Sequence, residues 1–73
     1  MLKVTPAQYR VLTAIQTLSE AQGYSPTQAQ VAELLGVSRP VMHRHVAAMC
    51  DKGVLRKTYG MPNSLEIVGE GGA

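Results

Sequence analysis

The sequence predicts a small, mainly α-helical domain that ends in a β-hairpin, and three observations support this. Apolar residues recur at helical spacing in three segments, each with its own start and stop residues. After residue 53 the pattern changes to two short runs of strand-forming residues around a turn-rich loop. The chain has 73 residues, which allows one hydrophobic core. We expect a domain over residues 1–68 and a flexible, Gly-rich C-terminal tail over residues 69–73.

The first helix is expected over residues 6–22. Thr5, followed by Pro6 and then by Gln8, matches a capping box with a proline in the first helical turn. Proline is tolerated there because its missing N–H would have no partner inside the helix. Apolar residues then recur at helical spacing until Gly23, which can adopt the left-handed backbone that ends many helices.

The second helix is expected over residues 28–35. Thr27 and Gln30 form another capping box, and Gly36 marks the end of the helix. Helical spacing predicts that its buried stripe consists of Val31, Leu34 and Leu35.

The third helix is expected over residues 39–52, with Ser38 or Arg39 as its cap. Gly53 supplies a stop signal. The residues predicted to face the core lie at i, i+4 and i+7, and they are Met42, Val46 and Met49.

Two strands are expected over residues 54–59 and 65–68, around a loop at residues 60–64 that contains Gly, Pro, Asn and Ser. A further short strand over residues 24–26 is also expected, because the residue before Pro26 is restricted to extended backbone. Three helices followed by a hairpin is the element order of the winged-helix fold, in which residues 54–68 form the wing.

The link between the second and third helices contains only Gly36, Val37 and Ser38, so these helices must diverge steeply. This geometry is that of a helix-turn-helix. Gly36 suits the positive φ of the turn, Val37 can fill the space between the helices, and Ser38 can cap the second one. The sequence therefore predicts a winged helix-turn-helix whose third helix enters the major groove of double-stranded DNA.

The distribution of charge agrees with a DNA-binding surface. Residues 38–60 contain five basic side chains against one acidic side chain and carry +4, while the net charge of the whole chain is +2. A basic half beside a mildly acidic half is typical of a protein that places one face on a polyanion. The basic residues of this segment are Arg39, Arg44, Lys52, Arg56 and Lys57.

Once the core stripe of the third helix is turned inward, the residues left facing outward are candidates for contacts with bases. An arginine can donate paired hydrogen bonds to guanine, and an aliphatic side chain can contact a thymine methyl group. The candidates on this helix, with its capping residue, are Ser38, Arg39, Val41, His43, Arg44 and Ala47. In the wing, contacts to backbone phosphates or to the minor groove are expected from Arg56, Lys57, Tyr59 and Asn63.

The chain as a whole resembles the N-terminal DNA-binding domain of LexA-type repressors. The resemblance lies in VAELLGVSRPVMHRHVAAM at 31–49, GYSPT at 23–27, KGVL at 52–55 and MPNSLEI at 61–67, and it covers residues 4–68. It implies repression through operator binding, with a homodimer on a palindromic site in a bacterial or phage setting. Members of that family continue into a self-cleaving Ser/Lys domain, and their wing commonly carries arginine where this chain has Asn63.

The sequence offers little support for other classes of protein. His43 and His45 point to opposite sides of a helix, the single Cys50 has no partner cysteine, and the acidic residues are dispersed, so neither a metal site nor a catalytic pair is expected. We therefore expect no enzyme activity, no cofactor and no small-molecule ligand. The lack of a long apolar run favours a cytoplasmic protein, associated with the nucleoid when bound to DNA.

Two functional interpretations remain open from the sequence. The first is a sequence-specific double-stranded DNA-binding transcriptional regulator. The second is a winged helix used as a low-specificity DNA-binding subunit of a replication or transposition complex, or as a protein-interaction adaptor. The basic segment argues against a pure adaptor, and nothing in the sequence separates the two modes of DNA binding.

Overall fold

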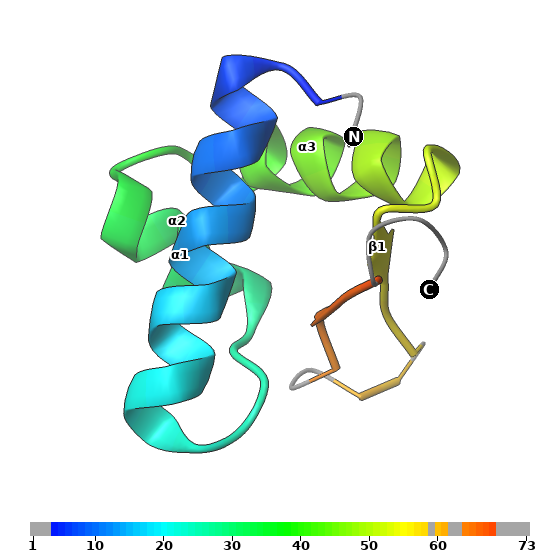
Figure 1. Cartoon of the computed structure of the whole chain (residues 1–73). Coiled ribbons are helices and arrows are strands. Elements are labelled where there is room, and N and C mark those ends of the chain that lie inside the picture. The colour runs from blue at the N-terminus through cyan, green and yellow to red at the C-terminus, as the bar shows by residue number, and fades with distance from the viewer. Residues whose placement is uncertain (1–3, 59, 62–63, 69–73) are drawn as a thin grey trace.

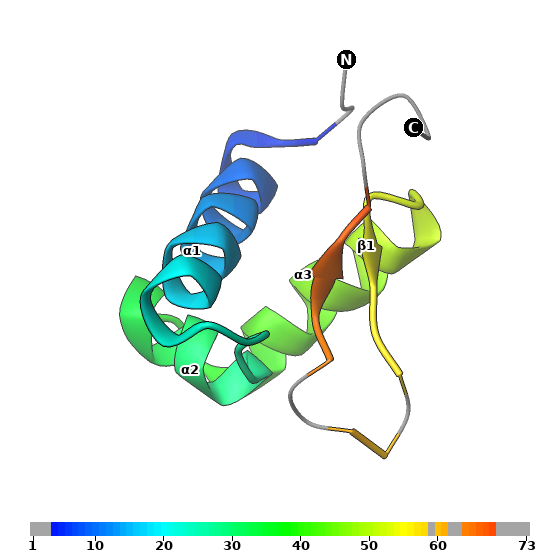
Figure 2. The ribbon, with the colours of Figure 1, turned by 60° about the horizontal axis from the view of Figure 1, so that its bottom comes forward.

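A computed structural model describes residues 4–58, 60–61 and 64–68. The elements follow in the order α1 (Pro6–Gln22), α2 (Gln28–Leu35), α3 (Arg39–Asp51), β1 (Leu55–Arg56) and β2 (Glu66–Ile67). In Figure 1, α3 crosses behind α1, α2 lies beside both helices, and the hairpin lies next to α3. Turning the molecule shows β1 and β2 side by side next to α3 (Figure 2). The predicted winged helix-turn-helix architecture is confirmed.

The predicted starts of the first two helices are confirmed in atomic detail. The hydroxyl of Thr5 accepts a hydrogen bond from the Gln8 backbone N–H, and the Gln8 side chain accepts one from the Thr5 N–H. Thr27 and Gln30 repeat this reciprocal arrangement at the start of α2. Each pair gives partners to backbone donors that the helix itself cannot satisfy. The limits of α1 and α2 follow directly from these local signals.

The helix α3 begins as predicted and ends one residue early. Ser38 is its cap, since its hydroxyl accepts a 3.3 Å hydrogen bond from the Val41 N–H. At the other end Lys52 is the capping residue, and Gly53 turns the chain with φ +77°. The N–H of Val54 then donates to the Met49 carbonyl at 3.1 Å, which closes the last turn.

The core lies where α1, α2, α3 and the hairpin meet. Met42, Val46 and Met49 are each at most 1% exposed, as the helical spacing predicted. The wing contributes buried side chains as well, so it is part of the core and not an appended loop. The remaining buried hydrophobic side chains are Val11, Leu12, Ala14, Ile15, Val31, Ala32, Val54, Leu55 and Leu65.

The predicted buried stripe of α2 was wrong at one position. Leu34 is 52% exposed, whereas Val31 and Ala32 are buried and Leu35 packs partly against the core. A helix of only two turns presents a narrow inner face, and the adjacent pair Val31 and Ala32 occupies it.

The predicted short strand over residues 24–26 was also wrong, because the sheet in the described part of the chain pairs only β1 with β2. Pro26 has no N–H to donate, and it is fully buried. The next N–H, that of Thr27, is already bonded to the Gln30 side chain at 2.9 Å. Neither Pro26 nor Thr27 therefore offers a backbone donor to a strand.

The hairpin is shorter than predicted. The paired residues are Leu55 with Ile67 and Arg56 with Glu66, against expected strands over 54–59 and 65–68. One more backbone bond joins the Val68 N–H to the Val54 carbonyl at 3.0 Å. Beyond Arg56 the ladder stops because the Thr58 N–H donates to the Ser64 hydroxyl at 2.9 Å instead of to a backbone carbonyl. The predicted tail, residues 69–73, lies outside the described residues.

Candidate nucleic-acid interface

The turn between α2 and α3 sets how α3 is presented. Gly36 has φ +71°, in the left-handed region where a side chain would be strained. Val37 is half-buried against the core, so it anchors the turn from inside. Ser38 uses its hydroxyl to cap α3, which makes it a positioning residue at the start of the helix. The roles predicted for Gly36 and Ser38 are confirmed, and Val37 packs against the core.

The two sides of α3 differ sharply in exposure. The side formed by Met42, Val46 and Met49 is buried in the core. At 100° per residue, the positions most nearly opposite this side are those of Pro40, Arg44, Ala47 and Asp51, and all four residues are exposed. The middle of this outward side thus presents one cation next to a small residue, an arrangement that allows close approach to a groove, and the carboxylate of Asp51 lies at its C-terminal end.

The other predicted residues on α3 lie to either side of this outward face. Arg39 and His43 are exposed on the side toward the wing. Val41 is half-buried, so only part of its side chain is available for a contact. His45 is half-buried as well.

Two hollows flank the junction of α3 with the wing. The first, named here the helix–wing hollow, lies between the starts of α2 and α3 and the wing, and has a volume of about 640 Å³. Its lining includes Thr27, Arg39, Met42, Lys57, Thr58 and Met61. The second, the α3–β1 hollow, measures about 520 Å³ and is lined by His43, Ala47, Cys50, Arg56 and Lys57 among others. Lys57 borders both hollows, the first together with Arg39 and the second together with His43.

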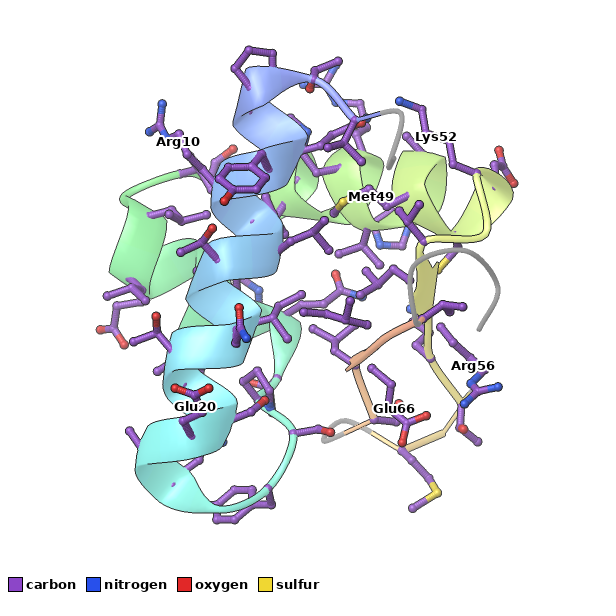
Figure 3. All side chains as sticks on the ribbon, viewed as in Figure 1. Arg10, Glu20, Met49, Lys52, Arg56 and Glu66 are labelled. Atoms are coloured by element: carbon purple, nitrogen blue, oxygen red, sulfur yellow. The ribbon has the colours of Figure 1, made fainter. Side chains whose placement is uncertain are left out.

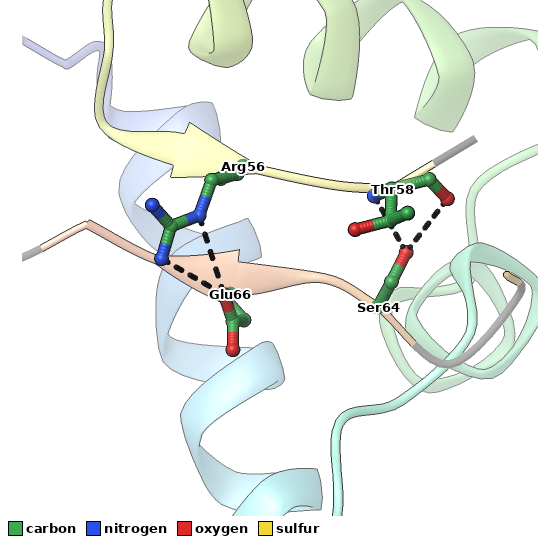
Figure 4. A network of polar contacts seen from close by, with 4 residues as sticks. All are labelled: Arg56, Thr58, Ser64 and Glu66. Carbon is green, nitrogen blue, oxygen red and sulfur yellow. Dashed lines mark hydrogen bonds and ion pairs between the residues drawn. The ribbon is translucent and has the colours of Figure 1, made fainter.

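The wing is held by polar contacts across the hairpin (Figure 4). The Arg56 guanidinium pairs with the Glu66 carboxylate at 3.1 Å, and both side chains are largely exposed, at 71% and 57%. The Ser64 hydroxyl accepts from the Thr58 N–H and lies 2.6 Å from the Met61 carbonyl, to which it can donate. These contacts fix the wing near its base, and they give Arg56 an acidic neighbour that sequence spacing did not indicate.

Lys52 has a structural contact that the sequence also did not indicate. Its ammonium donates a 2.8 Å hydrogen bond to the side-chain oxygen of Gln8, which is only 7% exposed. The same Gln8 side chain serves the cap of α1, so this bond ties the end of α3 to the start of α1. Figure 3 shows Lys52 at the end of α3, far from the wing residues Arg56 and Glu66. The expectation that Lys52 is one of the cations available to DNA is therefore weakened.

Two of the predicted wing contacts, Tyr59 and Asn63, lie outside the described residues. In the described part of the chain, no group of three His, Cys, Asp or Glu side chains is placed to hold a metal ion. The helices of that part include none long and apolar enough to cross a membrane.

The fold and the presentation of α3 define a winged-helix protein of the class that includes many transcription regulators. A profile of the MarR family matches residues 2–58, and the chain belongs to this family.

The relatives that the chain matches carry a more specific name. The chain is 37% identical over 70 residues to the LexA repressor of Pseudomonas chlororaphis. The aligned region covers 94% of this chain and 35% of that protein. It is 39% identical over 70 residues to the LexA repressor of Ectopseudomonas mendocina, covering 94% and 34%. The LexA repressor of Magnetococcus marinus is 35% identical over 65 residues, covering 89% and 28%. The resemblance to LexA-type repressors is confirmed, and the chain spans about a third of the length of these relatives.

Proposed function

We propose that this chain is a sequence-specific double-stranded DNA-binding transcriptional repressor. In this proposal α3 lies in the major groove, and the wing, residues 54–68, follows the backbone or the adjacent minor groove. The observation that carries the proposal is the presentation of α3, which has one side buried in the core and the opposite side exposed around Arg44 and Ala47. The repressor names of the matched relatives support it.

The proposed contacts divide by their place in the fold. Base contacts come from the exposed residues of α3 and from the accessible part of Val41, whereas the wing cations meet phosphate. Ser38 acts by capping the start of α3. The complete set is Ser38, Arg39, Val41, His43, Arg44, Ala47, Arg56, Lys57, Tyr59 and Asn63.

The proposed mode of action is that of a binding module without catalysis or cofactor. A single copy offers few cations to phosphate, since Lys52 bonds Gln8 and the charge of Arg56 is partly offset by the Glu66 carboxylate. We therefore propose that two copies occupy a palindromic site, because each half-site alone supplies little electrostatic affinity. The proposed location is the bacterial cytoplasm, on the nucleoid.

Selection of bound duplexes from a random double-stranded library tests this function. Reading by α3 predicts enrichment of one sequence motif, present as two inverted copies. Retention of duplexes without any enriched motif would show low-specificity binding, as in a replication or transposition subunit. Failure to retain any duplex would leave the protein-interaction adaptor as the better account.

A further inference from the structure

Two side-chain contacts join α1 to the helix-turn-helix, which is formed by α2 and α3. The first, named here the amide contact, links Gln22 with Gln30, and the second, the lysine contact, links Gln8 with Lys52. We propose that these two contacts fix the angle at which α3 is presented, which makes Gln22 and Lys52 positioning residues for sequence reading. The effect on reading rests on the proposed function, whereas the effect on the angle does not.

The amide contact holds the start of the helix-turn-helix. The Gln30 side-chain amide donates to the Gln22 side-chain oxygen at 3.0 Å, and the Gln22 amide donates in return at 3.5 Å. The Gln22 amide also donates to the Tyr24 carbonyl at 3.1 Å. Gln22 is the last residue of α1, and Gln30 lies in the first turn of α2. The end of α1 is therefore bonded to the start of α2.

The lysine contact holds the other end of the helix-turn-helix. Lys52 directly follows α3, and its ammonium donates to the Gln8 side-chain oxygen at 2.8 Å in the first turn of α1. Gln8 is only 7% exposed, so water would replace a lost donor poorly. The start of α1 is therefore bonded to the end of α3.

The two contacts lie at opposite ends of one helix. From Gln8 to Gln22 the axis of α1 advances by about 21 Å, at about 1.5 Å per residue. A rotation of α2 against α1 would stretch the amide contact, and a rotation of α3 against α1 would stretch the lysine contact. Together they restrain the orientation of the whole helix-turn-helix on α1.

The core beneath α3 explains why polar contacts are needed to fix this angle. Two of the three buried residues on its inner side, Met42 and Met49, are methionines. Methionine side chains are flexible and can adapt to small shifts of a helix, so packing alone selects the angle weakly. A hydrogen bond weakens steeply when it is misaligned, and satisfied polar contacts select one arrangement of a core.

Both contacts can be removed without disturbing a capping box. Gln8 and Gln30 belong to the capping boxes of α1 and α2, whereas their partners Gln22 and Lys52 do not. Lys52 ends α3 through its backbone N–H, which a change of side chain leaves in place. Gln22→Met and Lys52→Met therefore delete the two contacts and keep an unbranched side chain at each position.

The first test measures the full chain with Gln22→Met, Lys52→Met and the double variant, on the duplex recovered by selection and on a scrambled duplex. The temperature is chosen so that every variant is fully folded. Base contacts require closely held geometry, so each single change should weaken binding to the selected duplex several-fold and leave the scrambled duplex nearly unaffected. The double variant should lose more of the preference than either single variant.

Two further variants separate a change of angle from a loss of stability. Lys52→Arg retains a cationic donor for Gln8 and should restore most of the preference. Ile15→Val removes one methylene from a buried residue in the middle of α1, where it touches neither contact, and it lowers the stability of the fold. This matched control should keep the preference of the wild type.

A second readout needs no DNA. Residual dipolar couplings of backbone amides in the free protein report the orientation of α2 and α3 relative to α1. The couplings of Ile15→Val should fit the wild-type orientation, whereas those of the double variant should require a different or broader one.

Unchanged couplings in the double variant would overturn the inference, and so would an unchanged preference or an equal loss of preference in Ile15→Val. Equal binding of selected and scrambled duplexes by the wild type would instead contradict the proposed function. In that case the dipolar couplings still decide whether the two contacts fix the angle of α3.

Discussion

In the proposed function single residues on α3 have separate roles, and Arg44 is the residue proposed to read sequence most directly. It is exposed on the outward side, five positions after Arg39, which is the first residue of α3 and borders the helix–wing hollow. Capping by Ser38 and burial of Met42 fix the helix beneath it. A side chain on such a rigid support can discriminate between bases because its position does not adjust to a wrong one.

Arg44→Ala should therefore lose about 1 to 3 kcal/mol on the selected duplex and much less on scrambled DNA. Equilibrium titrations of both duplexes measure this difference. Arg10→Ala serves as the control, since Arg10 lies on α1. An equal loss on the two duplexes would show that Arg44 contributes charge and does not read sequence.

Lys52 illustrates how one contact changes the assignment of a residue. In the sequence it belongs to the basic segment, and in the structure it donates to the buried Gln8 side chain. Lys52→Met should lower the free energy of unfolding by about 1 kcal/mol. This value is the usual stabilisation by a charged hydrogen bond, lowered because the lysine is exposed to solvent. Thermal melts should then show a decrease of about 4 to 8 °C.

The same variant should leave the salt dependence of DNA binding unchanged. Lys57→Met, in contrast, should reduce the slope of log K against log salt by about one, as expected for one lost phosphate contact. If Lys52→Met also reduced the slope by that amount, Lys52 would be a phosphate contact and its bond to Gln8 would be incidental.

At the scale of elements, α3 is the centre of the fold as well as the proposed reading element. Its inner side packs against α1, α2 and the hairpin through side chains that are at most 1% exposed. Loss of packing there should loosen every element together.

Met49→Ala should destabilise the domain by about 2 to 5 kcal/mol, because it leaves a cavity in the core. That loss is a large part of the stability of a domain of this size. Denaturant unfolding of Met49→Ala and of Glu20→Ala makes the comparison, since Glu20 is exposed on α1 and its replacement should be nearly silent. Similar destabilisation by both changes would contradict this core.

The elements also show which parts of the fold a sequence reveals. The helix starts were predictable because each capping box is contained in four consecutive residues, as in Thr5 to Gln8. The leucine of α2 that faces inward was not predictable, because helical spacing alone did not exclude Leu34 from the buried side. The length of the strands depended on the Ser64 hydroxyl, which takes the Thr58 N–H from the ladder.

The candidate site was predictable in outline for a similar reason. The outward residues of α3 follow from helical spacing once the core stripe is identified. Contacts between distant segments do not follow from spacing. Examples are the bond between Gln8 and Lys52, 44 residues apart, and the pair of Arg56 with Glu66. That Arg39 and Lys57 border the same hollow likewise became evident only from the three-dimensional structure.

At the scale of the whole molecule, the account requires two copies on DNA. If the half-sites lie one turn apart on one face of the duplex, their centres should be about 34 to 36 Å apart. Sedimentation or mass photometry of the complex should show two chains per palindrome. A duplex with one half-site should bind much more weakly, and tight one-to-one binding to it at physiological salt would contradict the dimer.

Competition between two duplexes is the strictest test of whether α3 reads a DNA sequence. The selected duplex and a scrambled duplex of the same length and composition are titrated against the same protein at about 150 mM salt, where non-specific binding is weak. Sequence reading by α3 predicts that the selected duplex binds at least about 10³-fold more tightly. Affinities that agree within about tenfold would contradict it, because sequence-independent contacts with the backbone would then explain all of the binding.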